Sequence, residues 1–279
     1  MRIRLMSLIV LVMCVIAVPC FGQQGFLSAW EKRVKVTSSQ QPGWAVPVIA
    51  PSSGLVQLFR FDGIRQFTPT HTTTWNIDGG KGFNFIPWYK TELDFNLPPF
   101  IQHNAKNVVD GPGDFSMLLK YRLLAGNERH GNYSVSAAIA GSAPTGSYKN
   151  GSPDGTIAPT LFVGKGFRAF DAQTAVNWAL PTGHTKTMGR PIVWNTALQQ
   201  KIHRIFWPEV EFNSTFFRGG PHDGKVQTFV SPGFEVSKIK LNADETSRLA
   251  VVFGVAEQIA VTHYHSYNHG LAFTSRLVF

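Results

Sequence analysis

The sequence has 279 residues, of which 15% are charged, 13% are aromatic and 43% are hydrophobic, and its formal net charge is +9. Charged residues make up about 25% of a typical soluble domain. The low charge and the many aromatic residues therefore favour β-strands that either form a sandwich core or face lipid. The basic residues are scattered rather than clustered. Together with the export signal described next, this argues against nucleic acid as a partner.

Residues 1–22 are predicted to be a secretory signal peptide that is removed by cleavage. Arg2 and Arg4 stand before an apolar stretch that extends to Val18, and small residues lead to a predicted cut after Gly22. A basic start, a short apolar stretch and small residues at the cut are the three parts of such a signal. The apolar stretch is too short to be a confident membrane-spanning helix. We therefore expect an exported protein.

Both cysteines of the sequence, Cys14 and Cys20, lie within the predicted signal. The remaining chain is therefore expected to form no disulfide and no thiolate metal site. Cys20 also permits a lipoprotein interpretation, but the preceding Pro19 fits a lipoprotein signal poorly.

Residues 23–54 are predicted to form an irregular periplasmic arm before the folded domain. Prolines at positions 42, 47 and 51 and a glycine at position 43 interrupt regular structure. The arm is expected to tuck against or into the domain, with Trp30 and Trp44 as its anchors.

From residue 55 to residue 279, apolar residues alternate with polar or small ones, which is typical of β-strands with one apolar face. Leu119 and Tyr121, for example, alternate with Lys120 and Arg122. Most of these segments have about ten residues or more, the length that a tilted strand needs to cross a bilayer, whereas strands of soluble domains average about five or six. We therefore predict an all-β transmembrane antiparallel β-barrel of about twelve strands.

The predicted strands and connections follow one another in a regular order. The strands begin near residues 55, 70, 83, 113, 132, 157, 171, 191, 205, 225, 248 and 268. Long connections, expected to be extracellular, are 97–113, 144–156 and 181–190. Short connections, expected to be periplasmic, are 78–82, 168–171 and the turn near residue 204, whereas 240–247 is longer than expected.

The last predicted strand ends on an aromatic residue. Leu271, Phe273 and Leu277 share one face, and Arg276 lies on the other. A closing strand must pair with the first strand so that no edge remains in lipid. An alternating strand that ends in Phe279 resembles the signal that outer-membrane barrels present to their assembly machinery. The bacterial outer membrane is thus the expected location, with its lipid and lipopolysaccharide as partners.

Three short motifs carry a family resemblance. They read G-P-G-D-F at 111–115, K-Y-R-L-L at 120–124 and A-P-T-G at 143–146, and P-T-G recurs at 181–183. The series resembles the outer-membrane family named after the meta-pathway of phenol degradation. The resemblance implies a barrel that takes up small, often hydrophobic or aromatic compounds, and it implies no catalytic residues.

Charged residues on the lumen side of the strands are the candidate solute contacts. Carboxylates and basic groups are tolerated there because the lumen is wet or internally paired, and rings of charge select solutes in pores. These candidates are Glu92, Asp114, Lys120, Arg122, Glu209, Glu211 and Arg276. Trp88 is predicted to share the lumen parity, where it could stack on a solute, although a membrane-interface position is the simpler interpretation.

Metal binding and catalysis are weaker interpretations. His263, His265 and His269 cluster near the C-terminus, and imidazoles suit zinc, copper or nickel, but no carboxylate lies beside them. The sequence has no G-x-S-x-G motif of a serine hydrolase. We expect no metal, no cofactor and no enzymatic activity.

The small lumen-side residues at 134–140 and 254–260 favour a narrow open conduit. We therefore predict passive or facilitated uptake of small molecules, gated by the outer loops or the N-terminal arm. The alternatives are a non-transporting outer-membrane barrel with a structural or adhesive role, a barrel enzyme that modifies lipid, and a soluble secreted β-sandwich.

Overall fold

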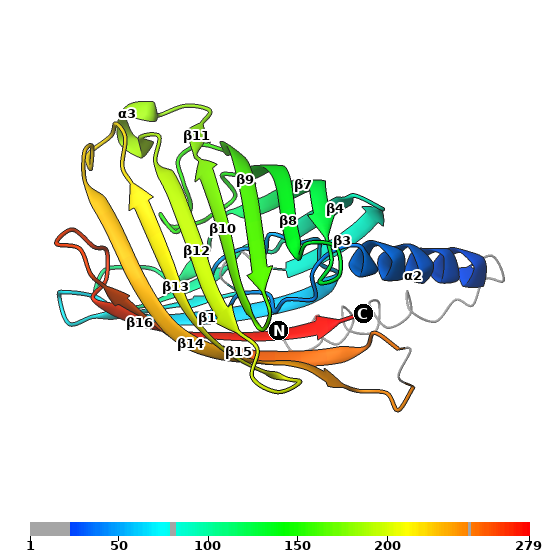
Figure 1. The fold of residues 1–279 in the computed structure, drawn as a ribbon. Helices are drawn as coiled ribbons and strands as arrows, with labels where there is room; N and C mark the ends of the chain where they lie inside the picture. Colours follow the sequence, from blue (N-terminus) through cyan, green and yellow to red (C-terminus); the bar gives the residue numbers. More distant parts are fainter. Residues whose placement is uncertain (1–22, 79–81, 245–246) are drawn as a thin grey trace, which may run out of the picture.

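A computed structural model describes residues 23–78, 82–244 and 247–279, so the predicted signal peptide at 1–22 lies outside the described residues. The chain forms a closed antiparallel barrel of twelve strands, preceded by the helix α2 (Gln23–Ser39) at one mouth (Figure 1). The predicted fold class and strand number are therefore confirmed. Within the described ranges, no helix is both long and apolar enough to cross a membrane.

Eight of the barrel strands are continuous, and four consist of two segments. The continuous strands are β1 (Leu58–Phe67), β8 (Tyr133–Ala143), β9 (Thr156–Phe167), β12 (Ile192–Gln200), β13 (Phe206–Phe216), β14 (Val226–Lys240), β15 (Ala250–Ala260) and β16 (His269–Val278). The divided strands are β2 (Thr73–Ile77) with β3 (Gly82–Trp88), β4 (Thr91–Asn96) with β5 (Phe100–Asn104), β6 (Gly111–Pro112) with β7 (Phe115–Gly126), and β10 (Phe170–Trp178) with β11 (Leu180–Pro181).

The barrel closes between its last and first strands. β16 pairs with β1 in an antiparallel register that runs from Leu58 opposite Val278 to Phe67 opposite His269. This pairing satisfies the main-chain groups of both strands, as a strand in lipid requires.

The alternation in the sequence separates the two faces of the wall. Leu119 and Tyr121 point outward and are about half exposed, whereas Lys120 and Arg122 point inward and are each 3% exposed. The same division holds on β16, where Phe273 is outward and Arg276 is buried. An apolar outer face with a polar lumen is the pattern of a barrel surrounded by lipid.

The two mouths differ in their connections. One mouth, the short-turn mouth, carries α2, the C-terminal end of β16 and the turns β3–β4, β7–β8, β9–β10, β12–β13 and β14–β15. The opposite mouth, the long-loop mouth, carries the loops 144–155 and 182–191, the second of which includes the short helix α3 (Thr185–Met188). These two loops match the predicted long connections at 144–156 and 181–190. The predicted long connection at 97–113 is wrong, because β5 and β6 lie within it, pair with each other and leave only residues 105–110 as the loop between them.

The predicted turn at 78–82 is wrong. Asp78 is buried, its φ is 65°, and its N–H donates to the carbonyl of Asp62 on the neighbouring strand. β2 and β3 both pair with β1, so Asp78 lies in an interruption of one strand, and the chain reverses at Tyr89 and Lys90 instead. The glycine-rich sequence at 78–82 resembles a turn, but strand pairing on either side outweighs this local preference.

The prediction of an irregular N-terminal arm also needs correction, because residues 23–39 form α2. The prolines that suggested irregular structure begin only at Pro42, after the helix has ended. Trp30 of α2 donates to the amide oxygen of Gln57 at 2.8 Å and lies 6.0 Å from the ring of Phe85. Together with buried Val34, Trp30 fixes the helix at the short-turn mouth.

Candidate functional site: the barrel lumen

Residues 40–57, called the inner segment below, occupy the lumen. The segment joins α2 to β1 and is drawn in blue in Figure 1. It has no helix or strand, yet Val48, Ala50, Ser53 and Leu55 are almost fully buried. The arm that the sequence predicted at 23–54 therefore divides into a helix at the mouth and a segment inside the barrel.

Acidic side chains of the wall accept hydrogen bonds from the main chain of the inner segment. Glu211, which is fully buried, accepts from the N–H of Ile49 at 2.7 Å and of Ala50 at 2.5 Å. Glu209 accepts from the N–H of Val48 at 3.0 Å. Both carboxylates belong to β13, so one wall of the lumen provides acceptors for three consecutive peptide units.

Basic side chains hold the carbonyl groups of the same segment. The guanidinium of Arg276 donates to the carbonyl of Val46 at 2.5 Å and of Pro47 at 2.7 Å, and it pairs with Glu235. Arg60 donates to the carbonyl of Val48. Because each buried charge has a partner of opposite sign or a polar main-chain group, the desolvation of these charges is compensated.

Lys120 and Glu92 form a second anchoring point. They make an ion pair at 2.9 Å. Lys120 also donates to the carbonyls of Ser52 at 3.2 Å and Gly54 at 3.1 Å, and Glu92 accepts from the N–H of Val56 at 2.5 Å. The inner segment is thus held at both ends of its buried course.

The small residues of the wall make room for the inner segment. Ser134 and Ser136 donate to the carbonyl of Ser53 at 3.1 and 3.0 Å. A Cβ atom on Gly254 would lie only 2.7 Å from Cγ2 of Val48. The expectation that these small residues line an open conduit is therefore wrong for this conformation, because the space that they leave is filled by the protein's own chain.

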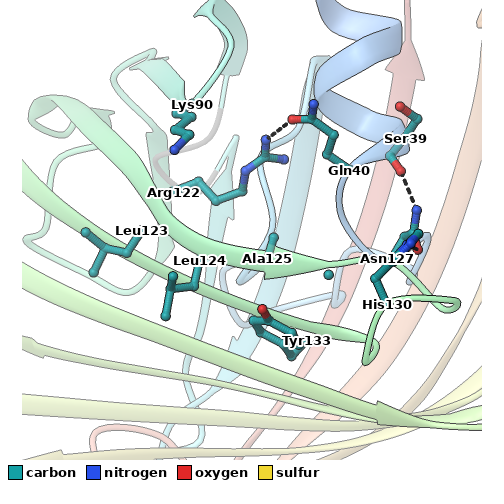
Figure 2. Close-up of a pocket in the computed structure, with 11 residues that line it drawn as sticks. Ser39, Gln40, Lys90, Arg122, Leu123, Leu124, Ala125, Asn127, His130 and Tyr133 are labelled. Atoms are coloured by element: carbon teal, nitrogen blue, oxygen red, sulfur yellow. Dashed lines mark hydrogen bonds between the residues drawn. The ribbon is translucent and has the colours of Figure 1, made fainter.

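Arg122 fixes the point where α2 passes into the inner segment. It donates to the carbonyl of Thr37 at 2.8 Å and to the side-chain oxygens of Gln40 and Gln41 at 3.0 Å. Figure 2 shows Arg122 and Gln40 beside a cavity of about 430 Å³ at the short-turn mouth. Lys90, Leu124, Asn127, His130 and Tyr133 also line this cavity.

A second cavity, of about 360 Å³, borders the inner segment. Val48, Ile49 and Pro51 of the segment contribute to its lining, together with wall residues that include Asp62 and Tyr267. Burial raises the pKa of the Tyr267 phenol above its usual range, so this group stays neutral. Its hydroxyl donates to the amide oxygen of Gln258 at 2.7 Å.

Six of the predicted solute-contact residues lie together in the lumen, and two do not. The six are Glu92, Lys120, Arg122, Glu209, Glu211 and Arg276. Asp114 instead lies at the long-loop mouth, where its carboxylate accepts from the N–H of Gly146 at 2.9 Å and of Ser152 at 2.7 Å. It orders the loop 144–155.

The predicted lumen position of Trp88 is wrong. Its side chain is 65% exposed on the barrel's outside, near the short-turn mouth. The pairing of β3 with β4 shifts register between Phe85 and Trp88. Such an irregularity re-aims the side chains that follow it, so simple alternation assigned Trp88 to the wrong face.

The three candidate histidines do not assemble a metal site. His265 contacts the carbonyl of Thr262 at 2.8 Å and the side chain of Asn268 at 3.0 Å, and His269 stacks on Phe67. No group of three or more potential metal ligands occurs in the part of the chain that the structure describes.

Sequence reasoning missed some residues that hold the inner segment. Gln173 of β10 accepts from the N–H of Ser53 at 3.0 Å and donates to the carbonyl of Ala45 at 2.9 Å. Arg60, which donates to the carbonyl of Val48, was also overlooked, as was Glu235, which pairs with Arg276. All three lie on the inward side of their strands, so inward parity combined with a polar side chain was the signal that could have found them.

A solved structure of another protein agrees with the architecture. No family model matches the sequence, and no curated protein does. The solved structure of the COG4313 outer membrane channel from Pseudomonas putida F1 superposes with a TM-score of 0.54 and 13% identity, covering 82% of this chain and 97% of that one. The fold is that of an outer-membrane β-barrel. The translocator domain of autotransporter NalP from Neisseria meningitidis gives a TM-score of 0.40 with 11% identity, covering 92% of this chain and 98% of that one.

Proposed function

We propose that the protein is an outer-membrane channel for passive or facilitated uptake of small molecules, and that the inner segment is its gate. The observation that carries this proposal is the lumen itself, whose inward charges make hydrogen bonds to a non-helical segment of the same chain. The proposal assigns the protein no catalytic role and no cofactor.

Val48 and Leu55 of the inner segment make apolar contacts with the wall, but its many hydrogen bonds are suited to a gate because water can replace them. On release, each main-chain group exchanges a hydrogen bond to the wall for one to water, so the net contribution of each bond is about 0.5–3 kcal/mol, with charged partners at the upper end. A segment held by packed apolar side chains would gain no such compensation from water. The wall charges that it leaves behind would also be hydrated in an open lumen.

The polar lumen favours polar solutes over the hydrophobic or aromatic compounds that the family resemblance implies. Glu209, Glu211, Arg60 and Arg276 would line the passage once the inner segment leaves. An apolar solute would have to displace water from these charges without replacing their hydrogen bonds, which is unfavourable. Membership of the phenol meta-pathway family remains part of the proposal.

The proposed location places the long-loop mouth outside the cell and the short-turn mouth in the periplasm. The outward apolar face fits outer-membrane lipid and lipopolysaccharide as its surroundings. Recognition of Phe279 by the assembly machinery and removal of residues 1–22 belong to the same proposal.

Conductance of the refolded full chain in planar bilayers tests the gate. The wild-type protein should be closed for most of the time, and the double variant Glu209→Ala/Glu211→Ala should show steady openings because three main-chain N–H groups lose their acceptors. Glu257→Ala is the matched control, since Glu257 is exposed on the outer face. A double variant that passes no ions and no small sugars would contradict the channel.

A second candidate is a non-transporting barrel with a structural or adhesive role. The filled lumen favours it, because a permanently closed barrel needs its interior packed. The same recordings separate the two candidates: a permanent plug predicts that weakening its contacts destabilises the protein without any flux.

A further inference from the structure

The hydrogen bonds between the wall and residues 45–56 of the inner segment are made chiefly by main-chain atoms, which every peptide has. Main-chain N–H groups at positions 48, 49, 50, 53 and 56 donate to the wall, and carbonyl groups at positions 45–48 and 52–54 accept from it. Among the described contacts, the side-chain hydrogen bonds from residues 45–56 to the wall are those of the Ser52 and Ser53 hydroxyls to Gln173, at 3.4 and 3.2 Å.

The acidic and the basic side chains that make these contacts lie on different sides of the inner segment. Glu209 and Glu211 on β13 accept from N–H groups, whereas Arg276 on β16 and Arg60 on β1 donate to carbonyls. A peptide unit offers a donor and an acceptor on opposite sides, so a peptide that passes between these strands satisfies both sets. Hydrogen bonds with one charged partner are roughly twice as strong as neutral ones.

Val48 packs closely against Gly254, but the lumen has free space beside other parts of the inner segment. A cavity of about 110 Å³ adjoins Val46, Pro51 and Ser52, and the cavity of about 360 Å³ adjoins Val48 and Ile49. These spaces lie beside positions whose main chain is held by the wall. Recognition of the main chain with free space at the side chains is the arrangement that lets a site accept peptides of varied sequence.

We propose that the lumen is a binding site for short peptides, and that the inner segment is its displaceable resident occupant. This inference rests on the proposed function, because it names the class of solute that the channel takes. A peptide that enters from the long-loop mouth meets Val48 and Ile49 at the cavity floor and replaces the segment contact by contact.

Thiol labelling of the inner segment tests the displacement. In the full chain with Cys14→Ser, Cys20→Ser and Ser53→Cys, the buried thiol should react slowly with a water-soluble maleimide. A peptide with the sequence of residues 45–56 should raise the labelling rate about tenfold, which corresponds to a shift of about 1.4 kcal/mol in the docking equilibrium. Lys186→Cys on exposed α3 is the control, and its labelling should not respond.

Two altered peptides test whether the barrel wall recognises the main chain of the peptide. A peptide of the same composition, scrambled at every position except those of Pro47 and Pro51 so that no proline removes a needed N–H donor, should raise labelling as much as the copy does. A copy that is N-methylated at the positions of Val48, Ile49 and Ala50 should have no effect, because it lacks the donors to Glu209 and Glu211. Equal effects of the methylated and unmethylated copies, or a response to the copy but not to the scramble, would overturn the inference.

Failure of the peptide site and failure of the channel give different results. If the labelling never rises but Glu209→Ala/Glu211→Ala conducts, the channel stands and the peptide proposal falls. If peptides raise labelling but no variant conducts, the site exists and the transport function falls. Should Ser53→Cys fail to fold, as judged by the loss of heat-modifiable gel migration, Ser52→Cys reports on the same segment.

Discussion

The outward and inward faces of the same strands place different requirements on their side chains. On β7, the outward residues Leu119 and Tyr121 contact whatever surrounds the barrel, and many apolar side chains would serve there. The inward residues Lys120 and Arg122 each contact particular atoms of residues 37–54. The outer face thus accepts many different apolar side chains, whereas each inward position needs one particular polar or charged side chain.

The first way to test this contrast is Arg276→Ala on the lumen face. It removes the donor to the carbonyls of Val46 and Pro47 and leaves Glu235 buried without its cation. Loss of one partner of a buried ion pair costs about 3–5 kcal/mol. We expect a lower free energy of unfolding in urea and faster proteolysis of the inner segment.

Arg276→Lys is the matched control, because it keeps the charge but loses the two-pronged geometry. It should recover part of the stability. If Arg276→Ala unfolds at the same urea concentration as the wild type, the lumen charges are not structural anchors.

A change on the outer face comes second. Leu119→Arg places a charge near the middle of β7, on the side that faces lipid. Arginine on the lipid face of a barrel costs about 2–4 kcal/mol at the bilayer midplane. Folding into vesicles should therefore be less favourable, as followed by gel mobility across a denaturant series.

Two results would show that the impaired folding of Leu119→Arg is caused by a charge on the outer, lipid-facing side of the barrel. Leu119→Phe should fold like the wild type, since the outer face asks only for an apolar side chain. Thiol labelling at Ser53→Cys should be unchanged by Leu119→Arg, and an increase would mean that the two faces are coupled.

The third change fills space in the lumen. Gly254→Ala adds a Cβ atom that would lie 2.7 Å from Val48 and 2.9 Å from Thr274. Overpacking of a close-packed site costs about 1–3 kcal/mol. Displacement of the inner segment relieves the clash with Val48, so the variant should open more often in planar bilayers than the wild type does.

Gly63→Ala is a control on β1, because its new Cβ meets no atom within 4 Å. Identical recordings for Gly254→Ala and wild type would show that Val48 does not fill the space at Gly254 in the membrane.

The sequence predicted the barrel and much of the lumen because alternation is a local property. Each inward charge could be assigned from its immediate neighbours, as for Lys120 between Leu119 and Tyr121. What fills the lumen could not be predicted in this way. Contacts such as that of Glu211 with Ile49 join residues far apart in the chain, and no local pattern in residues 40–57 specifies them. The small residues at 134–140 are compatible with a water-filled lumen and with a lumen filled by a peptide segment, so they do not distinguish the two.

Trp88 gives the smallest expected effect and tests the rule at the point where alternation failed. The side chain is 65% exposed and lies outside the barrel after the register shift in β3. Substitutions at such positions usually change stability by less than about 0.5 kcal/mol, so Trp88→Ala should leave the labelling of Ser53→Cys unchanged. The blue shift of total tryptophan emission on insertion into vesicles should become smaller in the variant, because six other tryptophans remain. Trp207→Ala is the informative partner: Trp207 is buried on the lumen side, under Lys201. If Trp88→Ala opened the barrel and Trp207→Ala did not, the assignment of Trp88 to the outside and of Trp207 to the lumen would be wrong.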